Sequence, residues 1–200
     1  QVELAATATQ TEVEDHVRRL AADKNVHGIL VQMPLPSHLN TEAVLRLIPA
    51  EKDVDGLTEA SMGRLMRDVP GHVGCTPLGV LRLLQHYGIA TSGKHVVVIG
   101  RSTLVGLPLS VLLARKGIDA TVTLAHSRTT HLEELCRNAD IVVSATGIAH
   151  SITAAHIAPG ATCIDVGISR TEAGIVGDFD AASVTGIAGA LTPMPGGTGI

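Results

Sequence analysis

The sequence predicts an α/β fold in which a smaller α/β region precedes a doubly wound parallel sheet. Short β-rich runs recur in the second half of the chain, separated by helical stretches or turns: His95–Ile99, Thr121–Ala125, Asp140–Ala145 and Thr162–Val166. The first of these runs leads through a glycine-containing turn into a helical stretch. The first third of the chain instead alternates helical segments with a single short apolar run. This change of pattern predicts two domains.

In the first region, Thr11 and Glu14 form a capping-box pattern that predicts a helix to about Asp23. The apolar run His27–Gln32 predicts a short buried strand, because two prolines follow it directly. Asn40 is a suitable N-cap for the next helix.

A hinge is predicted at Val69–Gly74, a segment with one proline, two glycines and few apolar residues. Thr76 and Pro77 then suit the N-cap and first position of the following helix. We therefore predict a domain boundary here, with a first domain at residues 1–72 and a second domain at residues 73–200.

The composition excludes several classes of protein. With 200 residues, 45% hydrophobic and 17% charged, the chain has enough length and apolar content for a buried core. Its net charge of −4 leaves no basic excess for a nucleic-acid backbone. Tyr87 and Phe179 are too few aromatic residues to stack single-stranded bases. Apolar stretches fall far short of the roughly 18 residues that cross a bilayer, so neither nucleic acid nor a membrane is an expected partner.

The cysteines Cys75, Cys136 and Cys163 are odd in number and far apart, which predicts neither a disulfide framework nor a CxxC metal site. A reducing cytoplasm is the expected location. The first residue is Gln1 rather than methionine, no signal-peptide pattern follows, and the chain stops just after a glycine-rich turn. We expect the sequence to be a fragment.

A phosphate-binding loop is predicted between Gly100 and Pro108, where a strand passes into a helix. Gly100 lets the backbone turn sharply, and Gly106 allows close approach of a ligand. The loop residue Ser102 and the N–H groups at the start of the helix are further anion-binding candidates. The spacing departs from GxGxxG, so a simple turn after a strand remains the alternative.

The end of the second strand discriminates between cofactors. In an NAD site, an acid near this point takes the ribose 2′-hydroxyl. Here the strand ends instead in His126, Ser127 and Arg128, with no acid, and Arg101 on the first loop can reach the same place. Hydroxyls and cations suit a 2′-phosphate, so NADP is the predicted cofactor. The alternative is an ordinary solvated basic turn.

Later strand ends repeat this arrangement. Thr146 and Gly147 follow the third strand, and Gly167 and Ile168 follow the fourth. Ligands of doubly wound sheets bind at such carboxyl ends, which makes Thr146, Gly147 and Ile168 candidate cofactor contacts. The glycines, like the turn at Pro193–Gly197, can equally be turn formers.

Ten histidines raise a different possibility, a metal hydrolase. The candidate pairs, His126 with His131 and His150 with His156, have neither the HxxxH spacing nor an accompanying acid motif. Surface or capping roles are favoured, and we expect no metal.

Eight short motifs occur in a characteristic order: HGILVQMPLP, EKDVDG, CTPLG, GRSTLVGLP, HSRT, DIVVSATG, IDVGI and TPMPGG. In these motifs the sequence closely resembles the methylenetetrahydrofolate dehydrogenase/cyclohydrolase family, the FolD-type bifunctional enzymes, and the match extends over nearly the whole chain. The resemblance implies a folate-side domain and an NAD(P)-binding Rossmann domain with a cleft between them, and a homodimer.

The resemblance also implies the chemistry. The family oxidises 5,10-methylenetetrahydrofolate to the 5,10-methenyl form by hydride transfer to NADP⁺, then hydrolyses it to 10-formyltetrahydrofolate, so tetrahydrofolate derivatives are the implied ligands. The motif positions Gln32 and Asp55 match folate-pocket residues of the family. Gln32 would hydrogen-bond the substrate or a catalytic amine, and Asp55 would accept N–H donors from the pterin ring. Without the other motifs, a strand-end Gln and a turn Asp are the simpler interpretations.

The sequence departs from the family in two places. It has no Tyr-x-x-x-Lys motif, whose lysine serves the hydrolysis in the family, and Thr198 and Ile200 replace the usual Val and Pro near the end. An incomplete record of a normal enzyme and a truncated chain both explain this. We expect the 200-residue polypeptide to bind NADP⁺ weakly and to lack cyclohydrolase activity. A noncatalytic NADP-binding module is the remaining alternative.

Overall fold

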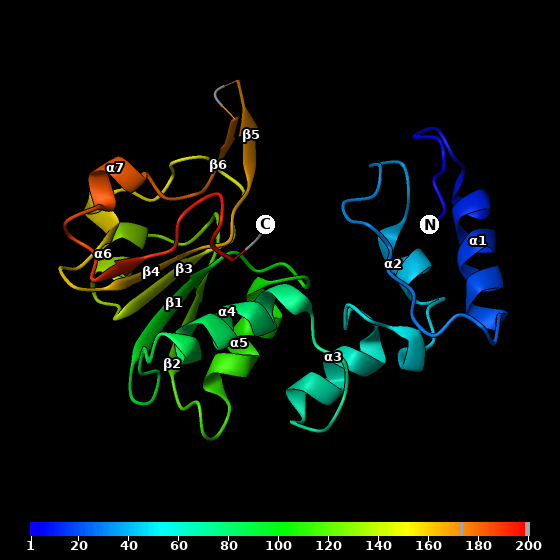
Figure 1. Cartoon of the computed structure of the whole chain (residues 1–200), viewed down its shortest axis with the longest axis horizontal. Helices are drawn as coiled ribbons and strands as arrows, with labels where there is room; N and C mark the ends of the chain where they lie inside the picture. Colours follow the sequence, from blue (N-terminus) through cyan, green and yellow to red (C-terminus); the bar gives the residue numbers. More distant parts are fainter. Residues whose placement is uncertain (173, 199–200) are drawn as a thin grey trace. The chain divides into compact units, whose positions relative to one another are not determined.

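The computed structural model describes residues 1–172 and 174–198. The chain divides into two compact units, Gln1–Gly74 and Cys75–Ile200, called here the N-terminal and the C-terminal unit. Figure 1 colours them from blue to cyan and from green to red. Ile200, named above as a departure from the family pattern, lies outside the described residues.

The N-terminal unit is mainly helical. Its elements are α1 (Gln10–Ala22), α2 (Thr41–Leu45), the 3₁₀ helix η1 (Ala50–Lys52) and α3 (Glu59–Met66). Buried apolar side chains of α1, α2 and the loops around them form one core: Val13, Val17, Ile29, Val44, Leu45 and Ile48. Two of these residues, Val13 and Val17, lie four positions apart on α1, so one face of this helix supplies its share of the core.

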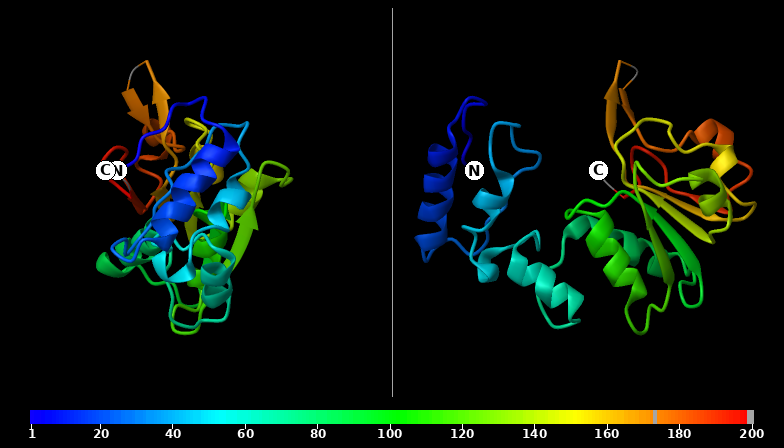
Figure 2. Two further views of the ribbon diagram at one scale, coloured as in Figure 1. Left: turned by 90° about the vertical axis from the view of Figure 1, so that its right-hand side faces the viewer. Right: turned by 180° about the vertical axis from the view of Figure 1, so that it is seen from behind.

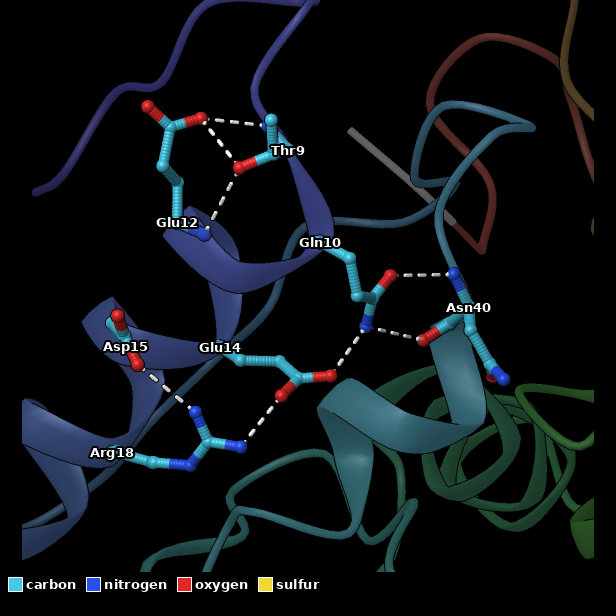
Figure 3. A network of polar contacts seen from close by, with 7 residues as sticks. All are labelled: Thr9, Gln10, Glu12, Glu14, Asp15, Arg18 and Asn40. Atoms are coloured by element: carbon cyan, nitrogen blue, oxygen red, sulfur yellow. Dashed lines mark hydrogen bonds and ion pairs between the residues drawn. The ribbon is translucent and has the colours of Figure 1, made fainter.

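The N-cap of α1 lies two residues earlier than the predicted one, Thr11. Thr9 is the N-cap: its Oγ1 accepts a hydrogen bond from the Glu12 N–H at 3.3 Å, and the Glu12 carboxylate accepts one from the Thr9 N–H at 2.7 Å. The predicted Thr11–Glu14 box is therefore wrong. The T-x-x-E pattern occurs in two overlapping registers, and the carboxylate of Glu14 instead accepts from Arg18 one turn later, at 2.6 Å (Figure 3).

The start of α1 is tied to the start of α2. The Gln10 amide accepts from the Asn40 N–H at 2.8 Å and donates to the Asn40 carbonyl at 3.3 Å (Figure 3). Asn40 also caps α2, as predicted, through a 3.1 Å bond from the Ala43 N–H to its side chain. The side chain of Gln10 thus holds the start of α1 against the start of α2.

The predicted strand His27–Gln32 is wrong. Within the described residues this segment makes a single parallel bridge, between Ile29 and Asp53, with a 2.7 Å bond from the Ile29 N–H to the Lys52 carbonyl. A strand needs a ladder of such bonds. The segment before Asp53 forms η1 and the segment after it turns, so only one rung can form.

The C-terminal unit contains a five-stranded parallel sheet, which confirms the predicted sheet. Its strands are β1 (His95–Ile99), β2 (Thr121–Ala125), β3 (Ile141–Ser144), β4 (Thr162–Asp165) and β7 (Ala190–Leu191), in the order β2-β1-β3-β4-β7. All residues of β3 and β4 are buried, which is why these strands show no alternation of apolar and polar residues.

Helices cover both faces of this sheet. Figures 1 and 2 show α4 (Cys75–His86) and α5 (Gly106–Ala114) on one face, and α6 (Leu132–Arg137) and α7 (Ala181–Val184) on the other. Helix α4 begins at Cys75, so the prediction of Thr76 as its N-cap is wrong. Pro77 still lies in the first turn, where a missing N–H leaves no intrahelical bond unmade.

A two-stranded antiparallel hairpin, β5 (Ser169–Thr171) with β6 (Gly174–Val176), follows the sheet strand β4. The sequence analysis does not predict it, because strands of three residues with exposed or half-exposed side chains have no apolar pattern. The hairpin returns the chain to the end of β4.

Candidate functional site

The carboxyl ends of four strands lie at one edge of the sheet. Their register pairs Ile99 with Ala125 and with Ser144, and Ser144 with Asp165. The chain leaves β1 toward β2 on one side and later places β3 on its other side, which makes this edge the topological switch point where ligands of such sheets bind. The loops that start here carry all the predicted cofactor residues: Gly100, Arg101, Ser102, Gly106, His126, Ser127, Arg128, Thr146, Gly147 and Ile168.

The loop after β1 has room only for glycine at its two key positions. Gly100 has a φ of +117°, and a Cβ there would lie 2.5 Å from the Ala145 carbonyl oxygen. A Cβ on Gly106 would lie 1.8 Å from the Gly100 carbonyl oxygen. The loop therefore closes tightly on itself at the start of α5, which forms a backbone cradle suited to a phosphate.

Part of this loop's hydrogen-bonding capacity is already used. The Leu107 N–H donates to the Ser102 carbonyl at 3.0 Å, and the Val105 N–H donates to the Ser102 hydroxyl at 3.1 Å. Pro108 has no N–H. The helix start thus offers fewer free N–H groups than the sequence predicts, because the loop uses them for its own closure, whereas Arg101 and Ser102 are exposed.

The end of β2 forms a compact polar turn. The Thr129 N–H donates to the His126 carbonyl at 2.8 Å, and the Arg128 N–H donates to His126 Nδ1 at 3.2 Å. These bonds turn the backbone inward, while Ser127 and Arg128 are exposed. A hydroxyl and a guanidinium therefore stand where an NAD site has its carboxylate.

A buried carboxylate that the sequence analysis misses organises the loop after β3. Asp178 is fully buried and accepts four hydrogen bonds: from Ser144 Oγ at 2.7 Å, Thr146 N at 2.7 Å, Thr146 Oγ1 at 2.9 Å and Ile148 N at 3.0 Å. Gly167 packs against this carboxylate, because a Cβ there would lie 1.8 Å from Asp178 Oδ1. The GD pair before Phe179 is the only signal of Asp178 in the sequence, and it resembles an ordinary turn.

A second buried carboxylate, that of Asp165 at the end of β4, is hydrogen-bonded to the backbone of Asp178. Asp165 is 2% exposed and accepts from the N–H groups of Asp178 and Phe179, both at 3.0 Å. Burial, with the nearby charge of Asp178, raises the pKa of Asp165, although the two N–H donors partly oppose this. Gly177 has no room for a side chain, since its Cβ would lie 2.0 Å from Asp165 Oδ2.

Gln32 and Asp55 belong to the N-terminal unit. Each follows one partner of the parallel Ile29–Asp53 bridge, so both lie beyond the same end of it. Gln32 is exposed, donates to the Met33 carbonyl at 3.1 Å and borders a largely apolar cavity of about 310 Å³. Its amide oxygen therefore remains available to a ligand.

The two acids of the DVDG motif have opposite environments. Asp53 is 1% exposed and accepts from the N–H groups of Leu57 at 3.1 Å and Thr58 at 2.8 Å. Burial alone would raise its pKa, but the hydrogen bonds, chiefly that from Thr58, lower the pKa of Asp53 below its usual range. Partial burial, together with the charge of Asp53, raises the pKa of Asp55. Asp53 thus serves the fold, and Asp55 is left with a half-exposed carboxyl group.

Among residues 1–172 and 174–198, no cluster of three or more His, Cys, Asp or Glu side chains is placed to hold a metal ion. Over the same residues, no helix has the length and apolar character needed to cross a membrane.

Comparison with known proteins identifies the family. The family model described as "Tetrahydrofolate dehydrogenase/cyclohydrolase, NAD(P)-binding domain" matches residues 74–200, and the one described as "Tetrahydrofolate dehydrogenase/cyclohydrolase, catalytic domain" matches residues 1–55. The chain belongs to the tetrahydrofolate dehydrogenase/cyclohydrolase family. Within this family assignment, the strand-end loops fall in the NAD(P)-binding domain, and Gln32 and Asp55 fall in the catalytic domain.

Relatives in this family are similar along nearly the whole chain. The bifunctional protein FolD of Sphingopyxis alaskensis is 52% identical over 203 residues, covering 98% of this chain and 67% of the relative. FolD of Lactiplantibacillus plantarum is 49% identical, with 98% and 69% covered. The methylenetetrahydrofolate dehydrogenase-cyclohydrolase of Trypanosoma brucei, solved with NADP and an inhibitor, is 39% identical with a TM-score of 0.91, with 98% and 69% covered.

Proposed function

We propose that this chain oxidises 5,10-methylenetetrahydrofolate to 5,10-methenyltetrahydrofolate with NADP⁺, as a cytoplasmic homodimer. The observation that carries the proposal is the end of β2, where Ser127 and Arg128 are exposed and no acid follows, beside Arg101 on the neighbouring loop. A 2′-phosphate is a dianion with several acceptor oxygens, which a hydroxyl and two guanidinium groups match. The Trypanosoma brucei relative, solved with NADP, supports the choice of cofactor.

The glycine cradle supports the same cofactor. Because Gly100 and Gly106 keep side chains away from the loop after β1, a pyrophosphate can approach the backbone closely there. When bound, NADP⁺ supplies the hydride acceptor. The lone pair of the adjacent nitrogen assists hydride departure from the methylene carbon, so the protein has to position two rings rather than supply a strong base.

In the N-terminal unit, we assign the folate to Gln32 and Asp55. The half-exposed Asp55 carboxylate would accept paired N–H donors from the pterin, and the free amide oxygen of Gln32 would accept a further donor. The raised pKa of Asp55 means that this carboxylate ionises less readily than an exposed one, which a bound cationic or N–H donor partner would reverse.

The name of the Trypanosoma brucei relative includes a second activity, that of a cyclohydrolase, and the family resemblance implies that this activity is hydrolysis to 10-formyltetrahydrofolate. It requires groups that orient water and handle its protons. The 200 residues contain no Tyr-x-x-x-Lys motif, so we propose the oxidation alone for them and assign hydrolysis only to a complete enzyme that carries such a lysine.

The test is a titration of the whole chain with NADP⁺ and NAD⁺, followed by an assay of NADPH formation with methylenetetrahydrofolate. Arg101→Ala and Ser127→Ala should each weaken NADP⁺ binding about tenfold to hundredfold and leave NAD⁺ binding unchanged, since a hydrogen bond to a charged group contributes about 1.5–3 kcal/mol. Arg82→Ala, an exposed arginine of α4, is the matched control. Equal losses for both nucleotides would refute the 2′-phosphate assignment.

The same assay addresses the noncatalytic alternative. NADPH absorbance that rises only when methylenetetrahydrofolate is added supports the enzyme. Cofactor binding without turnover, in a chain whose unfolding is cooperative, would favour a nucleotide-binding module. Light scattering after size-exclusion chromatography measures the expected homodimer.

A further inference from the structure

The loop at Thr146–Ile148 is wrapped around the carboxylate of Asp178. Three N–H and O–H donors of the loop point at this one group: Thr146 N at 2.7 Å, Thr146 Oγ1 at 2.9 Å and Ile148 N at 3.0 Å. The hydroxyl of Ser144, at the end of β3, adds a fourth at 2.7 Å. Convergent donors of this kind form an anion-binding hollow, and here the protein fills the hollow with its own carboxylate.

A filled hollow cannot take a phosphate. The donors of Thr146 and Ile148 are spent on Asp178, and a phosphate at this loop would also meet a negative charge. Gly147 at the exposed tip, with a φ of +68°, accepts at its carbonyl from the Ser169 hydroxyl at 3.0 Å. The tip therefore suits a neutral or cationic group.

The two halves of the sheet edge thus differ: the loops after β1 and β2 carry exposed cations, whereas the loops after β3 and β4 rest on buried carboxylates. Exposed Arg101 and Arg128 belong to the loops after β1 and β2. Asp178 and Asp165 lie beneath the loops after β3 and β4, and the hydrogen-bond partners described for both carboxylates are uncharged hydroxyl and N–H groups. No cation among these partners cancels the negative charge.

This polarity matches a dinucleotide bound in one direction. In doubly wound sheets the adenosine ribose lies at the end of β2 and the pyrophosphate at the helix after β1, so the second nucleotide extends past the other side of the switch point. On this chain that direction leads toward the loops after β3 and β4. The second nucleotide of an oxidised nicotinamide cofactor ends in a cationic ring, which becomes neutral on reduction.

We propose that Asp178, backed by Asp165, is a positioning residue that orients the dinucleotide and favours the cationic, oxidised nicotinamide over the reduced one. The inference rests on the cofactor part of the proposed function. Asp178 acts through the Thr146–Ile148 loop and through its field, because its side chain is fully buried. The site is thereby biased toward the oxidised cofactor that the dehydrogenase reaction consumes.

The experiment compares dissociation constants for NADP⁺ and NADPH, measured by calorimetry and fluorescence titration without folate. Asp178→Asn should weaken NADP⁺ binding about threefold to tenfold more than NADPH binding, the range expected when solvent strongly screens the loss of one charge. Ser144→Ala is the matched control, because it removes one hydrogen bond to Asp178 and keeps the charge. It should weaken both nucleotides alike.

A change that is merely structural would weaken both nucleotides equally, so an unchanged ratio in folded Asp178→Asn would overturn the inference. If thermal unfolding shows that this variant does not fold, Asp165→Asn replaces it. We expect a smaller change in the same direction, and an unchanged ratio of the NADP⁺ and NADPH dissociation constants would again contradict the inference. A wild-type chain that binds neither nucleotide would overturn this inference and the cofactor assignment together. Binding of both without folate oxidation would overturn only the proposed reaction.

Discussion

The loops after β1 and β2 and the loops after β3 and β4 share one sheet edge but are held in different ways. The first pair is held by local contacts: Gly106 packs on Gly100, and Arg128 N–H bonds to His126 two residues away. The second pair is held by Asp178, which lies 32 residues after Thr146 in the chain. Sequence motifs therefore predict the loops after β1 and β2, whereas the loops after β3 and β4 are supported by a segment distant in the sequence.

The largest effect should come from disrupting the loop after β1, which is held by local contacts. In Gly106→Ala the new Cβ would lie 1.8 Å from the Gly100 carbonyl, so the loop must open and the phosphate cradle is lost. We expect NADP⁺ affinity to fall by about a hundredfold or more, measured by fluorescence titration, since several backbone contacts to the phosphates would be lost together.

The matched control is Gly79→Ala in α4, where nothing lies within 4 Å of the added Cβ. This variant should bind NADP⁺ normally and gain up to about 1 kcal/mol in free energy of unfolding, because alanine favours a helix more than glycine does. Normal NADP⁺ binding by Gly106→Ala would show that the loop after β1 does not hold the cofactor.

The second prediction exchanges the chemistry at the end of β2. Ser127→Asp restores an acid that can bind a ribose 2′-hydroxyl and repel a 2′-phosphate, so the ratio of NADP⁺ to NAD⁺ affinity should fall about tenfold to hundredfold. Ser92→Asp, which adds the same charge before β1 at the opposite edge, should leave the ratio unaltered. A ratio that shifts equally in both variants would mean that net charge, not position, sets the preference.

The third prediction has the smallest expected effect and concerns the loops after β3 and β4, which are held by buried carboxylates. Burial raises the pKa of Asp165, so the native state binds this proton more readily than the unfolded chain does. The stabilisation that protonated Asp165 contributes is complete at pH values below the pKa of Asp165 in the unfolded chain. It is lost as the pH rises through the pKa of Asp165 in the native state. The difference in free energy of unfolding between wild type and Asp165→Asn should therefore fall as the pH rises, by about 1.4 kcal/mol for each unit of pKa difference.

Urea unfolding at a series of pH values across the carboxyl range measures this difference. Gln85→Ala, on the exposed surface of α4, is the control: it removes no ionisable group and should leave the pH dependence of the free energy of unfolding unaltered. A difference between wild type and Asp165→Asn that grows with rising pH would contradict the prediction, because it would require a lowered rather than a raised native pKa.

Much of the C-terminal unit is predictable from local pattern. Strands β1 to β4 are short β-rich runs flanked by turns or helices, and their ends agree with the prediction to within one residue. The same method fails in the N-terminal unit, where His27–Gln32 has the composition of a strand and makes only one bridge, at Ile29. Composition shows that a segment can enter a ladder, but a neighbouring segment must complete it.

The DVDG motif shows the same limit at the level of single side chains. Its two acids, Asp53 and Asp55, are equivalent in sequence. The family resemblance selects Asp55, and the structure gives the physical reason: folding buries Asp53 against the N–H groups that begin α3 and leaves Asp55 half-exposed.

By itself the sequence determined the positions of the parallel strands, the glycine loop after β1 and the polar, acid-free turn after β2, because each depends on residues adjacent in the chain. Only the tertiary structure decided that Asp178 and Asp165 lie buried under the loops after β3 and β4. The physical reason is that hydrogen bonds between residues tens of positions apart exist only after the sheet and the β5–β6 hairpin have brought their segments together.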